Sequence, residues 1–152
     1  EMDSSQKIAW VNKALALDKL QRHEEALSVY QKIVNSDPRD LLSLRNYGIA
    51  SYESRLPLQA IAILEELIKK RPQDAIAWCY LGLSHHQLGK THQAIAAIET
   101  SIQLDPQNRE VHQHLGRCLL KVGQHQEGLK KIRHSTGSIE FSLAKQQVFI
   151  HD

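Results

Sequence analysis

Landmark residues recur along this chain at one fixed interval, and that interval constrains the fold more than any other feature. Two series share a spacing of 34 residues: Pro38, Pro72, Pro106 and Ala26, Ala60, Ala94. A third series of small residues keeps the same step: Ala14, Gly48, Gly82, Gly116. Three series with one period indicate an array of similar units, each of which contacts only its neighbours.

Residues 75–108, AIAWCYLGLSHHQLGKTHQAIAAIETSIQLDPQN, form the best-preserved unit. This unit resembles a tetratricopeptide (TPR) repeat, a helix-turn-helix motif with the pattern W-x2-L-G-x2-Y…A-x3-F…P. The matching residues are Trp78, Leu81, Gly82, Ala94 and Pro106. His85 stands where the family prefers Tyr, and Ile98 where it prefers Phe. The resemblance covers residues 7–135, and its fourth unit is degenerate.

Each landmark has a physical role in a helix pair. Small side chains at Gly82 and Ala94 allow two antiparallel helices to approach closely. Pro106 disfavours helix at the preceding residue and ends the second helix of its unit. Residues two places after each repeat proline are suited to cap the next helix: Asp40, Asp74 and Asn108. Gly89 and Gly123 suit the tight turns within the third and fourth pairs, and Pro57 suits the first position of a helix.

The resemblance implies an all-α fold in which TPR-type units stack in a right-handed superhelix, followed by a short C-terminal tail. The predicted segments are a frayed N-terminus (1–6), repeats 1 to 3 (7–40, 41–74 and 75–108), a degenerate repeat 4 (109–135) and the tail (136–152). Gly128 replaces the expected Ala in repeat 4, and glycine inside a helix costs about 1 kcal/mol relative to Ala. We therefore expect the last helix of the array to be short and soft.

The tail alternates apolar and polar residues at Ile139, Phe141 and Leu143, a pattern that favours an extended segment. A capping helix is the alternative, because TPR arrays commonly end with one. Either form would pack its apolar residues on repeat 4 or on another chain.

Composition limits the classes of function. Hydrophobic residues make up 41% of the chain and charged residues 24%, with a net charge of +2. This weak, scattered charge predicts no nucleic-acid partner, and the lack of a long apolar run predicts no membrane insertion. Two cysteines in separate repeats favour a reducing compartment such as the cytoplasm, while a removed targeting segment stays open.

Motifs for catalysis, phosphate binding and metal binding are missing, so the sequence predicts a non-catalytic protein without a cofactor. The histidines are the candidates for metal ligands, because His86 and His114 could approach each other across a groove. The pairs His85–His86 and His112–His114 lack the i, i+4 spacing that places two ligands on one helix face. We therefore predict no metal site.

The concave groove that the resemblance implies is the candidate binding site, because repeat proteins of this type use it for recognition. Its positions in this sequence are Asn12, Leu15, Arg45, Asn46, Ile49, Tyr52, Tyr80, Leu83, His86, His114, Arg117 and Lys121, together with Cys79 and Gln113. Asn12 and Asn46 are equivalent, and an asparagine amide can both donate to and accept from a peptide backbone. We expect basic Arg45, Arg117 and Lys121 to favour an acidic ligand.

The resemblance also bears on which ligand is expected. Some TPR domains clamp a C-terminal carboxylate with basic and asparagine side chains, but here Val11, Leu15, Ile76 and Tyr80 occupy those positions. The predicted function is therefore an adaptor that binds a protein or peptide in its groove, without this clamp. Two alternatives stay open: a self-assembly module that forms a homo-oligomer through its terminal repeats and tail, and the recognition domain of a longer enzyme.

Overall fold

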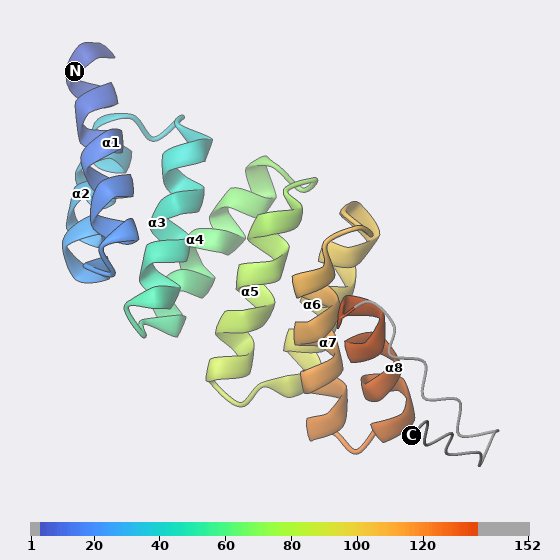
Figure 1. Cartoon of the computed structure of the whole chain (residues 1–152). Helices are drawn as coiled ribbons and strands as arrows, with labels where there is room; N and C mark the ends of the chain where they lie inside the picture. Colours follow the sequence, from blue (N-terminus) through green and yellow to red (C-terminus); the bar gives the residue numbers. More distant parts are fainter. Residues whose placement is uncertain (1–3, 137–152) are drawn as a thin grey trace, which may run out of the picture.

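The computed structural model describes residues 4–136 and, within them, consists of eight α-helices and no strand (Figure 1). The helices are α1 (Ser4–Lys19), α2 (His23–Ser36), α3 (Leu41–Glu53), α4 (Pro57–Lys70), α5 (Ala75–Gln87), α6 (Thr91–Leu104), α7 (Arg109–Lys121) and α8 (His125–Thr136). This confirms the all-α expectation. Residues 4–6, which the sequence predicted to fray, belong to α1. The extended or helical tail predicted for 136–152 lies almost wholly outside the described residues.

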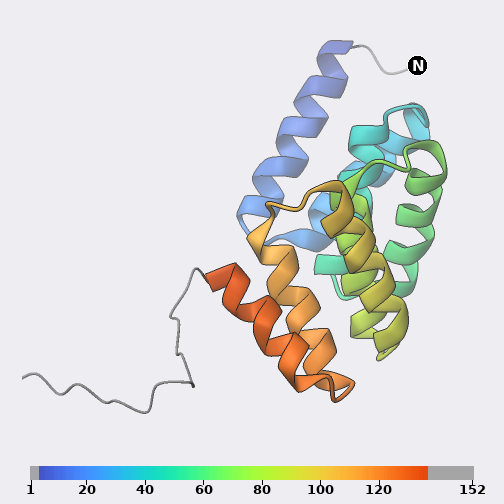
Figure 2. The ribbon, with the colours of Figure 1, turned by 90° about the vertical axis from the view of Figure 1, so that its right-hand side faces the viewer.

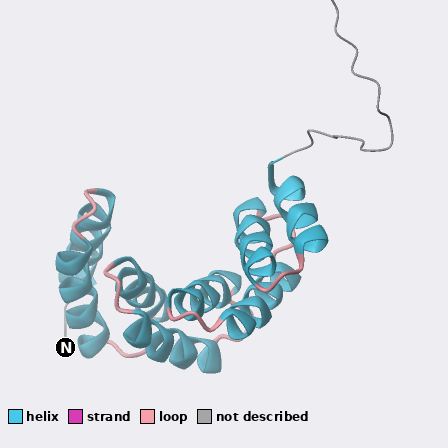
Figure 3. Cartoon of the chain, turned by 90° about the horizontal axis from the view of Figure 1, so that it is seen from below, coloured by secondary structure: helices cyan, strands magenta, loops and turns pink. Residues whose placement is uncertain are grey.

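The helices pack as four pairs, α1 with α2, α3 with α4, α5 with α6 and α7 with α8. Each pair is joined to the next because α2 contacts α3, α4 contacts α5, and α6 contacts α7. The pairs follow one another along the array in two views at right angles (Figures 1 and 2). Viewed from below, the array bends into an arc, so one of its faces is concave (Figure 3).

The predicted caps hold the starts of α3, α5 and α7. The Asp40 carboxylate accepts hydrogen bonds from the backbone N–H groups of Leu42 and Ser43. Asp74 accepts from the N–H of Ala77 at 3.1 Å, and Asn108 accepts from that of Val111 at 3.4 Å. These N–H groups have no partner within their own helix, so the caps satisfy them and set where each helix begins.

The small residues of the repeat lie where two helices of a pair touch. A Cβ atom on Gly82 would lie 2.6 Å from Ile98 Cγ1 and 3.0 Å from the Ala94 carbonyl oxygen. A Cβ atom on Gly128 would lie 2.8 Å from the Gly116 carbonyl oxygen. Gly128 therefore fits a close approach of α7 and α8, which offsets its poor helix propensity. The helix α8 reaches Thr136, where the described part of the chain ends, so the expected short and soft last helix stays a prediction.

One hydrogen bond recurs between the start of an odd helix and the proline before it. The Trp78 indole N–H donates to the Pro72 carbonyl at 2.9 Å. His112, one repeat later, places its Nε2 atom 2.9 Å from the Pro106 carbonyl. Because a carbonyl only accepts, the Nε2 atom of His112 carries the proton. Histidine at this position thus makes the same contact as tryptophan, although the two side chains differ greatly in size.

Each helix pair turns through one residue in the left-handed region. These residues share the 34-residue interval: Gln21 (φ +60°), Arg55 (+60°), Gly89 (+74°) and Gly123 (+83°). The sequence predicted this geometry only at the two glycines, because glycine has no Cβ to oppose a positive φ. Gln21 and Arg55 adopt it at a cost of about 1 kcal/mol each.

The variant Gln21→Gly is therefore expected to raise the free energy of unfolding by about 1 kcal/mol, since it relieves this strain. The measurement is chemical denaturation, with Gly89→Ala as a control of opposite sign. Nothing lies within 4 Å of a Cβ at Gly89, so strain alone should destabilise that variant. A loss of stability in Gln21→Gly would contradict the assignment of strain to this turn.

Candidate binding surface

The odd-numbered helices form the inner layer of the arc. Helix α3 contacts α5, and α5 contacts α7, in addition to the contacts within and between neighbouring pairs. Elements on the inside of a curve lie closer together than those on the outside. The helices α3, α5 and α7 therefore line the concave side that Figure 3 shows.

A cleft of about 330 Å³ lies between α3, α5 and α7, and we call it the basic cleft. Its lining residues are Tyr52, Arg55, Leu83, His86, Gln87, His114, Arg117, Cys118 and Lys121. Six predicted groove residues meet here: Tyr52, Leu83, His86, His114, Arg117 and Lys121. Arg55 and Gln87 were not predicted as groove residues, because the resemblance assigns only a subset of helix positions to the groove.

A second cleft of about 210 Å³ lies between α5 and α7, beside the basic cleft. Its lining residues are Ile76, Cys79, Tyr80, Leu83, Asn108, Glu110, Val111 and His114. Leu83 and His114 line both clefts, so the two are neighbours on one surface. This places the predicted residue Tyr80 on the same surface as the basic cleft.

Two tyrosines join α3 to α5 on this face. The rings of Tyr52 and Tyr80 meet edge to face, with centroids 5.5 Å apart and planes at 73°. Burial raises the pKa of Tyr80 to about 12 and also raises the pKa of Tyr52. Both hydroxyls therefore keep their protons at neutral pH and can donate a hydrogen bond to a ligand.

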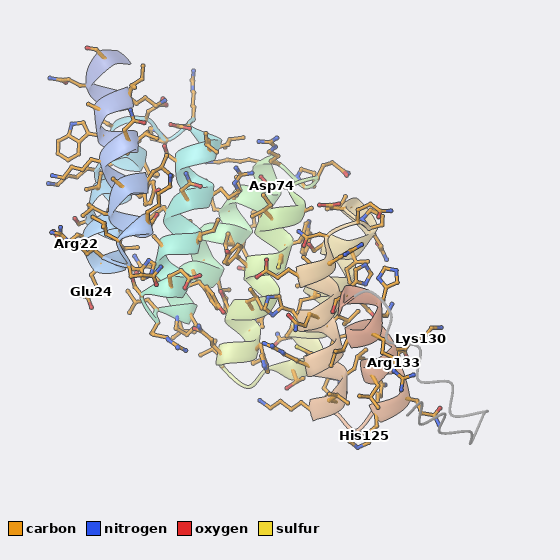
Figure 4. The ribbon with its side chains drawn as sticks, in the orientation of Figure 1. Arg22, Glu24, Asp74, His125, Lys130 and Arg133 are labelled. Carbon is orange, nitrogen blue, oxygen red and sulfur yellow. The ribbon has the colours of Figure 1, made fainter. Side chains whose placement is uncertain are left out.

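Arg45 differs from the other predicted basic groove residues, because it already has a carboxylate partner. Its guanidinium lies 3.3 Å from the buried carboxylate of Asp74, which caps α5 (Figure 4 labels Asp74). Arg71 lies 4.0 Å from the same carboxylate. Arg45 thus links α3 to the start of α5, and its charge is less available to a ligand than the expectation assumed.

Histidines 86 and 114 enter the basic cleft from opposite sides, His86 from α5 and His114 from α7. Burial lowers the pKa of both imidazoles, and Lys121 lowers the pKa of His86 further. The Nδ1 atom of His86 is buried and has no hydrogen-bond partner among the described residues. Within residues 4–136, no group of three or more His, Cys, Asp or Glu side chains is arranged to hold a metal ion.

Apart from Tyr52, the predicted residues of the first two repeats line neither cleft. Asn12 and Leu15 on α1 are exposed, and Asn46 and Ile49 on α3 are half-buried. They occupy the repeat positions of Tyr80 and Leu83, which do line the clefts. These four residues therefore extend the same surface beyond the two clefts.

An exposed apolar row on the odd helices escaped the sequence prediction. Ile8, Leu42 and Ile76 keep the 34-residue interval and expose 63%, 51% and 42% of their surface. Ile76 lines the second cleft, so the row leads into it. The sequence did contain a signal for this row, because the three residues are apolar and share one repeat position. The 34-residue period is more conspicuous among the residues that pack the helices together. We call these three residues the apolar row.

A shallower depression lies elsewhere, at the turns that follow α1 and α3. Arg22 and Glu24, labelled in Figure 4, line it together with Glu25, Glu53 and Arg55. The Arg22 guanidinium is already paired with Glu25 at 2.5 and 2.8 Å. The opposite charges that line this depression largely offset each other, so the depression is a weaker candidate site than the concave face.

Comparisons with known proteins give a consistent picture. Residues 8–40 match the family model described as "Tetratricopeptide repeat". Residues 58–135, just over half of the chain, match the model described as "Anaphase-promoting complex, cyclosome, subunit 3". A search of curated proteins found no significant match. In the described part of the chain, no helix has the length and apolar character needed to cross a bilayer.

Solved structures with the same fold include MamA (residues 41 to the end) from Desulfovibrio magneticus RS-1, with 22% identity and a TM-score of 0.79 over 88% of this chain and 75% of that one. TTC0263, a thermophilic TPR protein of Thermus thermophilus, has 15% identity and a TM-score of 0.78 over 85% and 72%. The first TPR of Spaghetti (RPAP3), bound to the HSP90 peptide SRMEEVD, has 20% identity and a TM-score of 0.74 over 80% and 97%. These likenesses concern the fold.

Proposed function

The chain belongs to the tetratricopeptide-repeat family, and we propose that it is a non-catalytic adaptor that binds a segment of a partner protein on its concave face. The observation that carries this proposal is the continuity of the apolar row with two clefts on the inner helices. Exposed apolar residues beside placed polar groups are typical of a ligand-binding surface. The Spaghetti structure, in which a TPR unit of the same fold is bound to a peptide, supports peptide binding by this fold.

The lining suits an extended or helical segment of a protein. The apolar row and Leu15 offer contacts for apolar side chains, and the amides of Asn12 and Asn46 can pair with a peptide backbone. The hydroxyls of Tyr52 and Tyr80 are further donors. A small metabolite would use one of the clefts, but it would leave the exposed row on α1 and α3 uncovered.

The alternative of self-assembly by stacking repeats end to end is less favoured. Lys13 occupies the repeat position of Tyr47, Leu81 and Leu115, which are all buried. The Trp10 ring lies near two ammonium groups, at 5.7 Å from Lys13 Nζ and 5.2 Å from Lys32 Nζ. A second copy stacked on α1 would have to remove these lysines from water, which is costly without a paired acid.

The test uses the full chain and peptides enriched from a random library by binding to it. The variant Leu42→Asp is expected to weaken an enriched peptide by about tenfold or more, because a carboxylate replaces an apolar contact. The matched control is Leu58→Asp on α4. Each substitution lies at the second residue of its helix, and both side chains are largely exposed, at 51% and 68%, so both should leave folding intact.

Equal affinity in the wild type and Leu42→Asp, with weaker binding in Leu58→Asp, would place the site on the outer layer and overturn the proposal. Failure to enrich any peptide, together with a concentration-dependent rise in molar mass during sedimentation, would favour self-assembly instead. Circular dichroism of both variants serves to check that they remain helical.

A further inference from the structure

The residues that line the basic cleft carry positive charge, although Arg55 also borders the shallower depression that contains Glu24, Glu25 and Glu53. Arg55, Arg117 and Lys121 all line this cleft, and its lining includes no Asp or Glu. The side chains of these three residues form no ion pair with any described residue. Lys7, by contrast, is paired with Asp37 and Asp40 at 2.8 and 2.9 Å.

The chemistry of the concave face changes at the fourth repeat. Ile8, Leu42 and Ile76 of the apolar row are followed, one interval later, by Glu110. A second series at the same interval, Leu15, Ile49 and Leu83, is followed by Arg117. These two series are therefore apolar in repeats 1 to 3 and charged in repeat 4.

We propose that the basic cleft is a subsite for the carboxylate of an acidic residue in the partner's segment, whose apolar side chains lie along the apolar row. This inference rests on the proposed function and adds the chemistry of the ligand: an acidic end and an apolar stretch. Arg117 can pair with a carboxylate in a forked arrangement, and Lys121 supplies a mobile point charge. The Tyr52 hydroxyl and the Gln87 amide are neutral donors in the same cleft.

A protein segment fits this surface better than a nucleic acid. A polyanion would favour positive charge along the whole surface, because each bound phosphate contributes to affinity. Here the first three repeats present apolar residues instead, and Arg45 is paired with Asp74. Among the described residues of this surface, Arg55, Arg117 and Lys121 gather in the basic cleft without a carboxylate in its lining, which matches a ligand with a localised negative charge.

The two histidines of the cleft predict that ligand affinity depends on pH, which a purely structural role of the cleft would not produce. His86 faces Lys121 and Arg117 from α7 and Tyr52 and Arg55 from the α3 side, while His114 also lies 3.8 Å from a Glu110 carboxylate oxygen. Burial and the nearby cations favour their neutral forms by lowering the pKa of each imidazole. A bound carboxylate favours the imidazolium form, so binding takes up protons and affinity rises as pH falls.

The experiment begins with the enriched peptides that bind the wild type but not Leu42→Asp. Their acidic residues are changed to Gln or Asn, and affinity is measured for wild type and for Arg117→Glu/Lys121→Glu. We expect the charge-reversed variant to lose about tenfold or more in affinity for the peptide. Removal of the peptide's acidic residue as well should cause little further loss of affinity. The matched control is Lys69→Glu/Lys130→Glu, which makes the same change in net charge at exposed sites on α4 and α8 (Figure 4 labels Lys130).

The pH arm uses the same peptide between about pH 8 and pH 5.5, where its carboxylates stay ionised. Affinity should rise several-fold toward the lower pH, and His86→Gln/His114→Gln should flatten this profile. The subsite proposal would be overturned if the peptides whose binding depends on Leu42 lacked acidic residues. It would also be overturned if they bound Arg117→Glu/Lys121→Glu as tightly as the control variant. Either result would leave the adaptor proposal standing. Displacement of the peptide by a short single-stranded RNA with higher affinity would assign the cleft to a nucleic acid instead. Peptides that ignore Leu42→Asp would contradict the proposed function itself.

Discussion

Replacement of Gly82 by alanine is expected to lower the free energy of unfolding by about 2 kcal/mol, or the Tm by about 6 °C. The added Cβ would lie 3.0 Å from the Ala94 carbonyl oxygen and 3.2 Å from the Ile98 backbone nitrogen. These are main-chain atoms of α6, so relief of the overlap requires α5 and α6 to separate. Alanine gains about 1 kcal/mol in helix propensity, which only partly offsets this cost.

Gly48→Ala is the matched control in the neighbouring repeat. The three atoms nearest to its Cβ would all belong to side chains, with Leu64 Cδ2 at 2.7 Å and Leu64 Cγ at 2.8 Å. A side chain can change its rotamer at lower cost than a helix can move, so Gly48→Ala should lose at least about 1 kcal/mol less. Chemical denaturation of both variants measures the difference. Equal loss in the two variants would show that the approach of the helix backbones does not determine the small residue at this position.

The helix pairs could be predicted from the sequence because their signals are local. Asp40, Asp74 and Asn108 cap helices through hydrogen bonds to residues two or three places away. Pro57 begins α4, and Gly89 adopts the expected positive φ. Such signals depend on a few neighbouring residues, and the 34-residue period repeats them along the chain.

Contacts between repeats were harder to predict. The pairing of Arg45 with Asp74 joins residues of two repeats, and the sequence indicated only that both are polar. The turn at Arg55 requires a positive φ, which the presence of an arginine in the sequence does not indicate. His112 makes with Pro106 the hydrogen bond that Trp78 makes with Pro72, and the sequence did not indicate that either bond would form.

The candidate site was predicted in part. Six groove residues converge in the basic cleft, whereas Asn12, Leu15, Asn46 and Ile49 lie on the open part of the surface. These six residues converge because α3, α5 and α7 lie together on the inside of the curved array. The curvature of the array cannot be predicted from any single residue of the sequence. The binding role of all these residues is a proposal that experiment must test.

Photo-crosslinking tests the central claim most directly, because it reports which face touches the ligand. A photoreactive residue is placed singly at Leu42, Ile76, Leu58 and Leu129, whose side chains are all at least two-fifths exposed, from 42% at Ile76 to 68% at Leu58. Leu42 and Ile76 belong to the inner helices, and Leu58 and Leu129 to α4 and α8. With an enriched peptide bound, crosslinks are expected from Leu42 and Ile76 and to be absent from the other two positions. Crosslinks from Leu58 or Leu129 alone would contradict binding on the concave face.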